Sequence, residues 1–197
     1  MAEWNEDQEW ERQWWGTCVN TMCEEAKQIS YAHRMGLVNT PQGEFWPVYN
    51  LEGKSVIDIG GGPVSMLLRT INGGKLLVAE PCAYPSWTID RYASHNIDHL
   101  QCAGEDLVPE DHEYDEAWIY NVLQHVKDPA LIIANARKIA KTIRLFEWVN
   151  IPACPGHPQE LKAQLLDEWL GGRGTVERMN GENNCYGTAY YGVFAGE

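Results

Sequence analysis

Basic residues are scarce in this chain of 197 residues. Fifteen lysine and arginine residues stand against 28 aspartate and glutamate residues, which gives a formal net charge of −13. A charge of this sign repels the phosphates of duplex nucleic acid and of anionic membranes. We therefore expect that DNA is not a partner, although a local basic patch would act against the overall charge.

Several other features are also missing. The six cysteines form no C-x-x-C pair and no cysteine–histidine zinc spacing, so we expect no metal site. No apolar run approaches the roughly 18 residues of a membrane-spanning helix. The first residues are acidic and lack a continuous apolar region, so we expect no signal peptide. Together these absences predict a cytoplasmic protein with reduced cysteines and no membrane span.

The first 40 residues predict a helical extension ahead of a main domain at 41–197. Apolar positions recur every three or four residues between Trp14 and Leu37, which predicts an amphipathic helix with a buried stripe. The stripe comprises Val19, Met22, Cys23, Ala26, Ile29 or Ser30, His33 and Leu37. Because every expected strand lies downstream, we expect the main domain to fold without residues 1–37.

Strand and helix patterns alternate from residue 55 onward. Strands are expected at 55–59, 75–80, 98–102, 114–123 and 142–150, and helices at 63–71, 85–95, 129–141 and 159–170. Asp128 is the expected cap of the third of these helices. Two last strands, at 174–180 and 188–196, have no helix between them and therefore pair antiparallel. The pattern predicts an α/β fold with a mostly parallel sheet of seven strands and helices on both faces.

Three consecutive glycines, Gly60, Gly61 and Gly62, follow the first of these strands. Glycine at this density is costly inside apolar sequence unless the backbone turns sharply or approaches a ligand. A strand, a glycine turn and a helix together place backbone N–H groups at a helix N-terminus, which suits an anionic or polar ligand. The dinucleotide spacing G-x-G-x-x-G is not met, because Ser65 stands at the third position and Pro63 lacks an N–H.

A different spacing, acid-x-G-x-G, is met by Asp58 and the glycines that follow it. An acid at this place repels a pyrophosphate but receives a cationic amino group, directly or through water. S-adenosylmethionine carries such a group and no phosphate. Glu80 ends the second strand, 22 residues later. It is placed to accept hydrogens from both ribose hydroxyls, as in NAD and S-adenosylmethionine sites. The alternative is a plain surface acid.

Four stretches match the motifs of a known family. They read VIDIGGGPVSMLL, LLVAEP, CAGEDL and YDEAWIYNVLQHVKDPALII, within residues 53–150. The chain resembles the class I S-adenosylmethionine-dependent methyltransferases, most closely the small stand-alone enzymes of the ubiquinone-biosynthesis type. This resemblance implies a Rossmann-like fold, a helical lid at the N-terminus, S-adenosylmethionine as cofactor and S-adenosylhomocysteine as product.

The resemblance also implies roles for individual residues. Gly104, with Glu105 or Asp106, would hold the adenine, since Ala103 stands where the family's usual aspartate would fall. Asn121 would touch the methionine part of the cofactor. From its place in the extension, Tyr31 would reach the cofactor carboxylate.

Candidates for the chemistry lie at the carboxyl ends of the fourth and fifth strands, where such sheets bind ligands. His157 lies on a Pro/Gly-rich loop that can arch over the pocket, and His125 is either a base or a structural residue. Glu147 either faces the pocket or caps a neighbouring element. The other candidates are Tyr120, Asn121, Gln124, Trp148 and Asn150.

The stretch YNVLQH lacks the N/D-P-P-aromatic loop of enzymes that methylate base amines. A small-molecule acceptor therefore leads, methylated at O, N or C, and RNA or protein acceptors remain open. A cofactor-binding module without chemistry is the second hypothesis, and a NAD-dependent oxidoreductase is a distant third. A monomer or a homodimer is expected.

Overall fold

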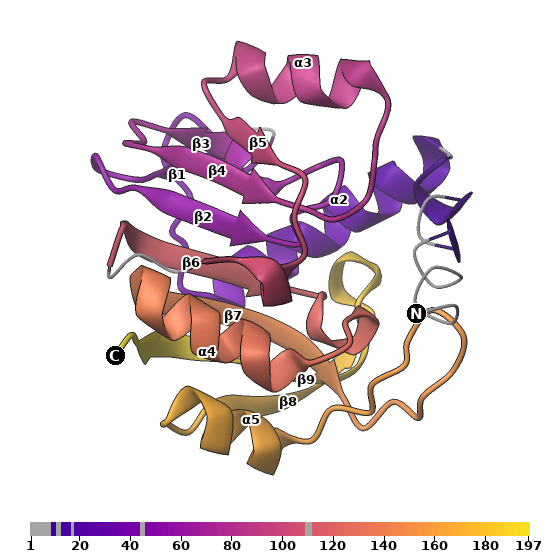
Figure 1. Cartoon of the computed structure of the whole chain (residues 1–197). Coiled ribbons are helices and arrows are strands. Elements are labelled where there is room, and N and C mark those ends of the chain that lie inside the picture. Colours follow the sequence, from indigo (N-terminus) through magenta and orange to yellow (C-terminus); the bar gives the residue numbers. More distant parts are fainter. Residues whose placement is uncertain (1–8, 11–12, 17, 44–45, 109–111) are drawn as a thin grey trace.

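The computed structural model describes residues 9–10, 13–16, 18–43, 46–108 and 112–197, with the backbone alone at 18–20. Its centre is a sheet of seven strands in the order β5-β4-β2-β6-β7-β9-β8 (Figure 1). The first five of these run parallel, and β9 pairs antiparallel with both β7 and β8. The predicted mostly parallel sheet with a reversed end is therefore confirmed. The strands are β2 (Val56–Ile59), β4 (Leu76–Ala79), β5 (Asp98–Leu100), β6 (Tyr114–Tyr120), β7 (Ala140–Val149), β8 (Thr175–Asn180) and β9 (Tyr186–Ala195).

Helices cover both faces of this sheet, as predicted. Figure 1 shows α4 and α5 in front of the strands and α2 behind them. The Asp128 side chain accepts a hydrogen bond from Leu131 N at 3.0 Å, which confirms the expected cap of α4. Gly171, in the left-handed region at φ +65°, ends α5. The helices are α2 (Cys18–Arg34), α3 (Ser86–Ser94), α4 (Pro129–Ile139) and α5 (Ala163–Leu170).

The side chains of β6 divide the core into two halves, because successive residues of a strand point to opposite faces. Ala117 and Ile119 pack with α4 and α5 in one buried cluster. Trp118 and Tyr120 pack on the other side in a cluster rich in aromatic rings. Both clusters are almost fully excluded from solvent, so the sheet is a rigid platform for the loops at its edge.

The predicted helix at 63–71 is wrong. That segment forms a short 3₁₀ turn, η1 (Met66–Arg69), which runs directly into strand β3 (Thr70–Ile71). Strand β3 pairs in parallel with β1 (Tyr49–Asn50) to form a separate two-stranded sheet. Thr70 and Ile71 are both β-branched, which favours a strand, and their pairing with β1 takes precedence over the local helical pattern. The glycine turn therefore leads into one short turn, and no α-helix N-terminus lies behind it.

The predicted buried stripe of α2 is also wrong. Met22 is 69% exposed, and Cys23 and His33 are exposed as well. The buried side of α2 carries Tyr31 and Ala32, which belong to the aromatic cluster on that face of the sheet, as does Met35 just after the helix. The backbone periodicity is helical as expected, but the helix is rotated from the face that apolar residues alone indicate.

The packing of α2 bears on the predicted division at residue 40. Tyr31, Ala32 and Met35 are at most 1% exposed and share their cluster with Trp118 and Phe146. Removing residues 1–37 would expose this cluster, so we no longer expect the remainder to fold alone. Within the described residues, no helix has both the length and the apolar character needed to cross a membrane.

Candidate functional site

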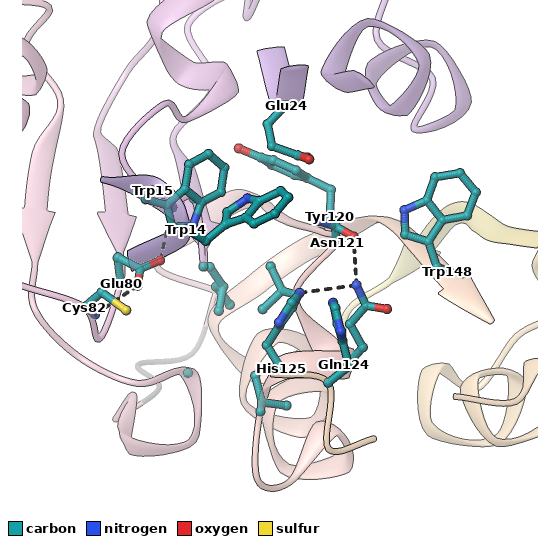
Figure 2. A pocket seen from close by; sticks show the side chains of 18 of the residues that line it. Trp14, Trp15, Glu24, Glu80, Cys82, Tyr120, Asn121, Gln124, His125 and Trp148 are labelled. Atoms are coloured by element: carbon teal, nitrogen blue, oxygen red, sulfur yellow. Dashed lines mark hydrogen bonds between the residues drawn. The ribbon is translucent and has the colours of Figure 1, made fainter. Parts of the chain in front are cut away.

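A cavity of about 390 Å³ opens where β2, β4, β6 and β7 end. This edge is where ligands bind in open α/β sheets, and the volume lies within the range of ligand pockets, roughly 300–1,000 Å³. Residues of α2 and of the segment before it cover the cavity. Figure 2 shows Trp14 and Glu24 on one side of it and Gln124, His125 and Trp148 on the other.

The glycine turn forms one wall of this cavity. Gly60 and Gly62 have φ values of +76° and +62°, which a residue with a side chain adopts only with strain. A Cβ atom on Gly60 would lie 2.6 Å from Val122, and one on Gly61 would lie 2.6 Å from the Asp58 carboxylate. Val122, in the loop after β6, therefore leaves no room for a side chain at Gly60, and Asp58 of β2 leaves none at Gly61.

Asp58 lies behind the turn and does not line the cavity. Its Oδ2 atom accepts hydrogen bonds from Ser65 Oγ and Tyr120 Oη, both at 2.5 Å. Burial raises the pKa of this carboxyl to about 7, although the two hydrogen bonds act in the opposite direction. The structure thus places Asp58 as a support of the turn. The spacing predicts that it receives an amino group directly or through water, and the direct contact is not available to a carboxyl that does not line the cavity.

Glu80 does line the cavity and is 6% exposed. Its Oε2 atom accepts a hydrogen bond from Gly62 N at 3.1 Å, and its Oε1 atom accepts one from Cys82 N at 2.9 Å. These bonds fix the carboxylate at the end of β4, beside the glycine turn (Figure 2). A carboxylate offers about four acceptor positions, so two bonds leave capacity for ligand hydroxyls.

Gly104 and Glu105 also line the cavity, on the short turn η2 (Gly104–Asp106). A Cβ atom on Gly104 would lie 3.0 Å from Ile59 and from Ile132, so this backbone is packed closely. The Glu105 carboxylate accepts hydrogen bonds from the N–H groups of Lys127 and Asp128, at 3.0 and 3.2 Å. Its charge is thereby directed at the turn before α4.

Glu147 is fully buried in β7 and does not line the cavity. Its Oε1 atom accepts hydrogen bonds from Val122 N at 2.9 Å and Leu123 N at 3.0 Å. Burial raises the pKa of this carboxyl to about 7. Of its two expected roles, the geometry matches the capping of a neighbouring element, here the loop after β6, and it does not match contact with a substrate.

That loop brings Asn121, Gln124 and His125 to the cavity. Asn121 directly follows β6. Its φ is +56°, a conformation that asparagine tolerates. Gln124 Nε2 donates to Asn121 Oδ1 at 3.0 Å and lies 3.2 Å from His125 Nε2. His125 Nδ1 lies 2.7 Å from the carbonyl oxygen of Gly156.

His157 lies beside His125, a proximity that the sequence does not predict. The two imidazole rings are 4.4 Å apart between centroids, and both line the cavity. His157 Nδ1 is also 3.5 Å from Cys154 Sγ, and the ring meets Trp10 edge-on at 6.1 Å. In the described part of the chain, no group of three or more His, Cys, Asp and Glu side chains is arranged to hold a metal ion.

Tyr31 lines the cavity from α2, and three further residues of that helix do so although the sequence did not indicate them. These are Glu24, Lys27 and Gln28, of which Glu24 pairs with Lys27 and is 5% exposed. With Tyr31 they share one helical face at spacings of three and four residues. The sequence signal for this face is the spacing of these polar side chains, which apolar periodicity does not reveal.

No protein-family model and no curated protein sequence matches the chain. Solved structures do match. The fold is that of the class I methyltransferases. All of the matches described below share 13% sequence identity with the chain, so they bear on the fold alone.

Three of these structures illustrate the likeness. The Haloferax volcanii methyltransferase in complex with the Trm112 activator has a TM-score of 0.63 and 13% identity, over 97% of each chain. Magnesium protoporphyrin IX methyltransferase of Synechocystis PCC 6803, with bound SAH, has a TM-score of 0.60 and 13% identity, over 91% of this chain and 88% of that one. The Burkholderia thailandensis 1,6-didemethyltoxoflavin-N1-methyltransferase, with its substrate and S-adenosylhomocysteine, has a TM-score of 0.56 and 13% identity, over 73% and 71%.

Proposed function

We propose that this chain is an S-adenosylmethionine-dependent methyltransferase that acts on a small-molecule acceptor. The observation that carries the proposal is the buried Glu80 carboxylate, fixed on Gly62 N at one wall of the cavity. The fold supports it, and two of the similar enzymes were solved with S-adenosylhomocysteine bound. The cavity also suits a cation, since three glutamates line it against one lysine, Lys27, which pairs with Glu24.

The residues of the cavity fit S-adenosylmethionine. Glu80 would accept hydrogens from the ribose hydroxyls, and Gly104 would pack against the adenine. Gln28 lines the cavity, is 5% exposed and donates to Val64 O at 2.8 Å, while its Oε1 atom has no partner among the described residues. A buried carbonyl oxygen in this state favours a donor, so we assign the amino-acid end of the cofactor to Gln28, Tyr31 and Asn121.

Methyl transfer from a sulfonium is an in-line displacement, in which the cofactor supplies the methyl group. The protein's contribution is to align the acceptor atom with the methyl carbon and the sulfur and to exclude water. Trp14 and Trp15, which line the cavity, form its cover together with Tyr31. We keep His157 as the candidate base, because its imidazole lines the cavity, and we assign His125 and Glu147 to positioning the loop after β6.

Three predictions from the sequence also remain part of this proposal. We expect the chain to belong to the ubiquinone-biosynthesis type of methyltransferase, to be cytoplasmic, and to be a monomer or a homodimer. The division into residues 1–40 and 41–197 stays a prediction as well, with the first part acting as a lid over the cavity.

Calorimetric titration with S-adenosylhomocysteine tests the proposal. We expect a dissociation constant in the micromolar range, about −8 kcal/mol, and no heat with NAD⁺. Heat with NAD⁺ and none with S-adenosylhomocysteine would overturn the assignment. A cofactor-binding module without chemistry is the second candidate, and it predicts binding with no methylated product from any acceptor.

A further inference from the structure

Gln124 presents an unpaired carbonyl oxygen to the cavity. Its side chain is 5% exposed and lines the cavity, and its Oε1 atom has no hydrogen-bond partner among the described residues. Leaving a buried carbonyl oxygen unpaired is costly, because the atom gives up its hydrogen bonds with water and gains none in return. Such an atom inside a ligand cavity indicates that the ligand brings the missing N–H or O–H group.

The orientation of the Gln124 amide follows from a chain of hydrogen bonds. The carbonyl oxygen of Gly156 can only accept, so His125 Nδ1, 2.7 Å away, carries a hydrogen. In the neutral imidazole, Nε2 is then an acceptor, and it lies 3.2 Å from the Gln124 amide nitrogen. Asn121 Oδ1 accepts from the same nitrogen at 3.0 Å. Both partners require the NH₂ group, which leaves the oxygen facing the opposite side (Figure 2).

The same chain of bonds limits what His125 can do. Its Nε2 lone pair is engaged by the Gln124 amide, and its Nδ1 hydrogen is engaged by Gly156. His125 is therefore a positioning residue, which acts on the ligand through the orientation of Gln124. An amide oxygen is too weak a base to remove a proton, so Gln124 orients the group that it binds and does not activate it.

The walls near Gln124 are aromatic. Trp148 is 7% exposed and lies edge-on to Tyr31, with ring centroids 6.3 Å apart. Trp10 and Trp14, which also line the cavity, stack with their ring centroids 5.5 Å apart. Aromatic walls of this kind favour a planar or apolar ligand body.

We infer that the acceptor is a planar amine and that the reaction is N-methylation, with Gln124 as the specificity-determining residue. This inference rests on the proposed function. An amine donates an N–H to Gln124 and still has a lone pair to attack the methyl carbon. A hydroxyl in the same place would need a base such as His157 to take its proton at the moment of attack, whereas an amine reacts through its lone pair without one.

In the methyl transfer, the N–C bond forms while the C–S bond breaks. The electron pair of the C–S bond stays on sulfur, giving the thioether S-adenosylhomocysteine. The methylated nitrogen carries the positive charge until its proton passes to water. No oxidant, reductant or metal ion takes part, so the residues described above are sufficient.

Binding of matched aromatic compounds to the S-adenosylhomocysteine complex tests the inference. The amines are aniline, 5-aminoindole and 6-aminoquinoline, each beside its methyl isostere: toluene, 5-methylindole and 6-methylquinoline. We expect the best-binding amine to bind about tenfold more tightly than its isostere. Equal binding within every pair, or no binding of any of the amines, would overturn the inference.

Three variants separate the role of Gln124 from a general loss of structure. Gln124→Met should reduce the preference for the amine to about onefold, and His125→Phe should do the same through loss of the amide's anchor. Gln101→Met, on an exposed residue outside the cavity lining, should keep the full preference. An unchanged preference in Gln124→Met would contradict the assignment.

Product analysis separates nitrogen from oxygen as the acceptor atom. The amines and the matching phenols (phenol, 5-hydroxyindole and 6-hydroxyquinoline) are incubated with S-adenosylmethionine and examined by mass spectrometry. A methylated amine supports the inference, and a methylated phenol without its methylated amine overturns it. Failure to bind S-adenosylhomocysteine at all would instead count against the proposed function, which is measured first.

Discussion

The two halves of the cavity are built in different ways. In the cofactor half, the glycine turn and Glu80 are held by short backbone hydrogen bonds, such as the one from Gly62 N to the Glu80 carboxylate. In the acceptor half, Gln124 follows β6 and Trp148 lies near the end of β7. The glycine turn and Glu80 are close in sequence and bonded to each other, whereas the acceptor half is assembled over longer distances and leaves Gln124 Oε1 without a partner among the described residues.

This difference indicates where selectivity resides. A group that the backbone already holds in place, such as the Glu80 carboxylate, presents one fixed shape, which suits a constant cofactor. A half that contains an unpaired buried oxygen gains most from a ligand that supplies its partner, which suits a selected acceptor. Variants that damage one half of the cavity and spare the other test this difference.

The largest effect is expected from Gly60→Ala. The new Cβ atom would lie 2.6 Å from Val122, at a φ of +76°, so both backbone strain and a clash result. We expect the free energy of unfolding to fall by about 2–4 kcal/mol and S-adenosylhomocysteine binding to weaken at least about 100-fold. Denaturant unfolding and calorimetry measure the two effects.

Gly53→Ala is the matched control for this variant. Gly53 has a φ of +86°, and a Cβ atom there would meet nothing within 4 Å. It therefore reports the backbone strain alone, about 1–2 kcal/mol, and should leave cofactor binding unchanged. Equal effects of the two variants on binding would show that the glycine turn is not a cofactor wall.

Glu80→Ala should weaken S-adenosylhomocysteine binding by about 1.5–3 kcal/mol, because charge-assisted hydrogen bonds to two hydroxyls are lost. The variant also leaves Gly62 N and Cys82 N without their acceptor, so some loss of stability is expected too. Glu105→Ala, whose carboxylate is bonded to Lys127 N and Asp128 N, should weaken binding less. Calorimetry of both variants compares them, and the reverse order would move the ribose to Glu105.

The buried Glu147 predicts a pH dependence of stability. Its pKa is raised in the folded state to about 7, so the folded protein keeps a proton that the unfolded chain has lost. The free energy of unfolding therefore falls as the pH rises from about 4.5 to 7, by on the order of 3 kcal/mol for this group. Glu147→Gln removes this contribution and keeps an acceptor for Val122 N and Leu123 N.

Unfolding in denaturant between pH 4.5 and 8 measures this effect. The decline with pH should be shallower in Glu147→Gln, and the remaining slope should include the other buried carboxyl, Asp58, whose pKa is also raised to about 7. Identical slopes in the variant and the unmodified protein would show that folding does not raise the pKa of Glu147.

The smallest effect is expected from Trp15→Ala. Trp15 lies 3.8 Å from the position of a Cβ atom on Gly62, so its indole covers the glycine turn. We expect S-adenosylhomocysteine binding to weaken about fivefold, about 1 kcal/mol, with little change in stability. Trp87→Ala, at a tryptophan that is 54% exposed on α3, is the control and should bind normally. Equal affinity of the two variants would mean that Trp15 is not part of a lid.

The sequence predicts the cofactor half well because that half depends on local signals. The glycines at 60–62 and Glu80 follow two strand patterns directly, and parallel strands end at one edge of the sheet. The role of Asp58 could not be predicted, since the spacing does not say that Tyr120 and Ser65 occupy its carboxylate from the other side. The missing helix after the glycines depends on pairing between β1 and β3, which no local pattern indicates.

The acceptor half was predictable only in part. Gln124 and Trp148 follow strand ends, so the topology places them near the site. The face of α2 that meets the cavity could not be predicted from apolar periodicity, because the buried residues on that face include the polar Glu24 and Gln28. The orientation of Gln124 depends on Gly156, 32 residues away in the chain, through His125.

The division of the cavity is tested most directly by a crystal structure with S-adenosylhomocysteine bound. We expect the ribose hydroxyls on the Glu80 carboxylate, the adenine against Gly104, and the sulfur facing an open space bounded by Gln124 and Trp148. A ligand whose homocysteine part fills that space and pairs with Gln124 Oε1, or whose ribose lies away from Glu80, would contradict this arrangement.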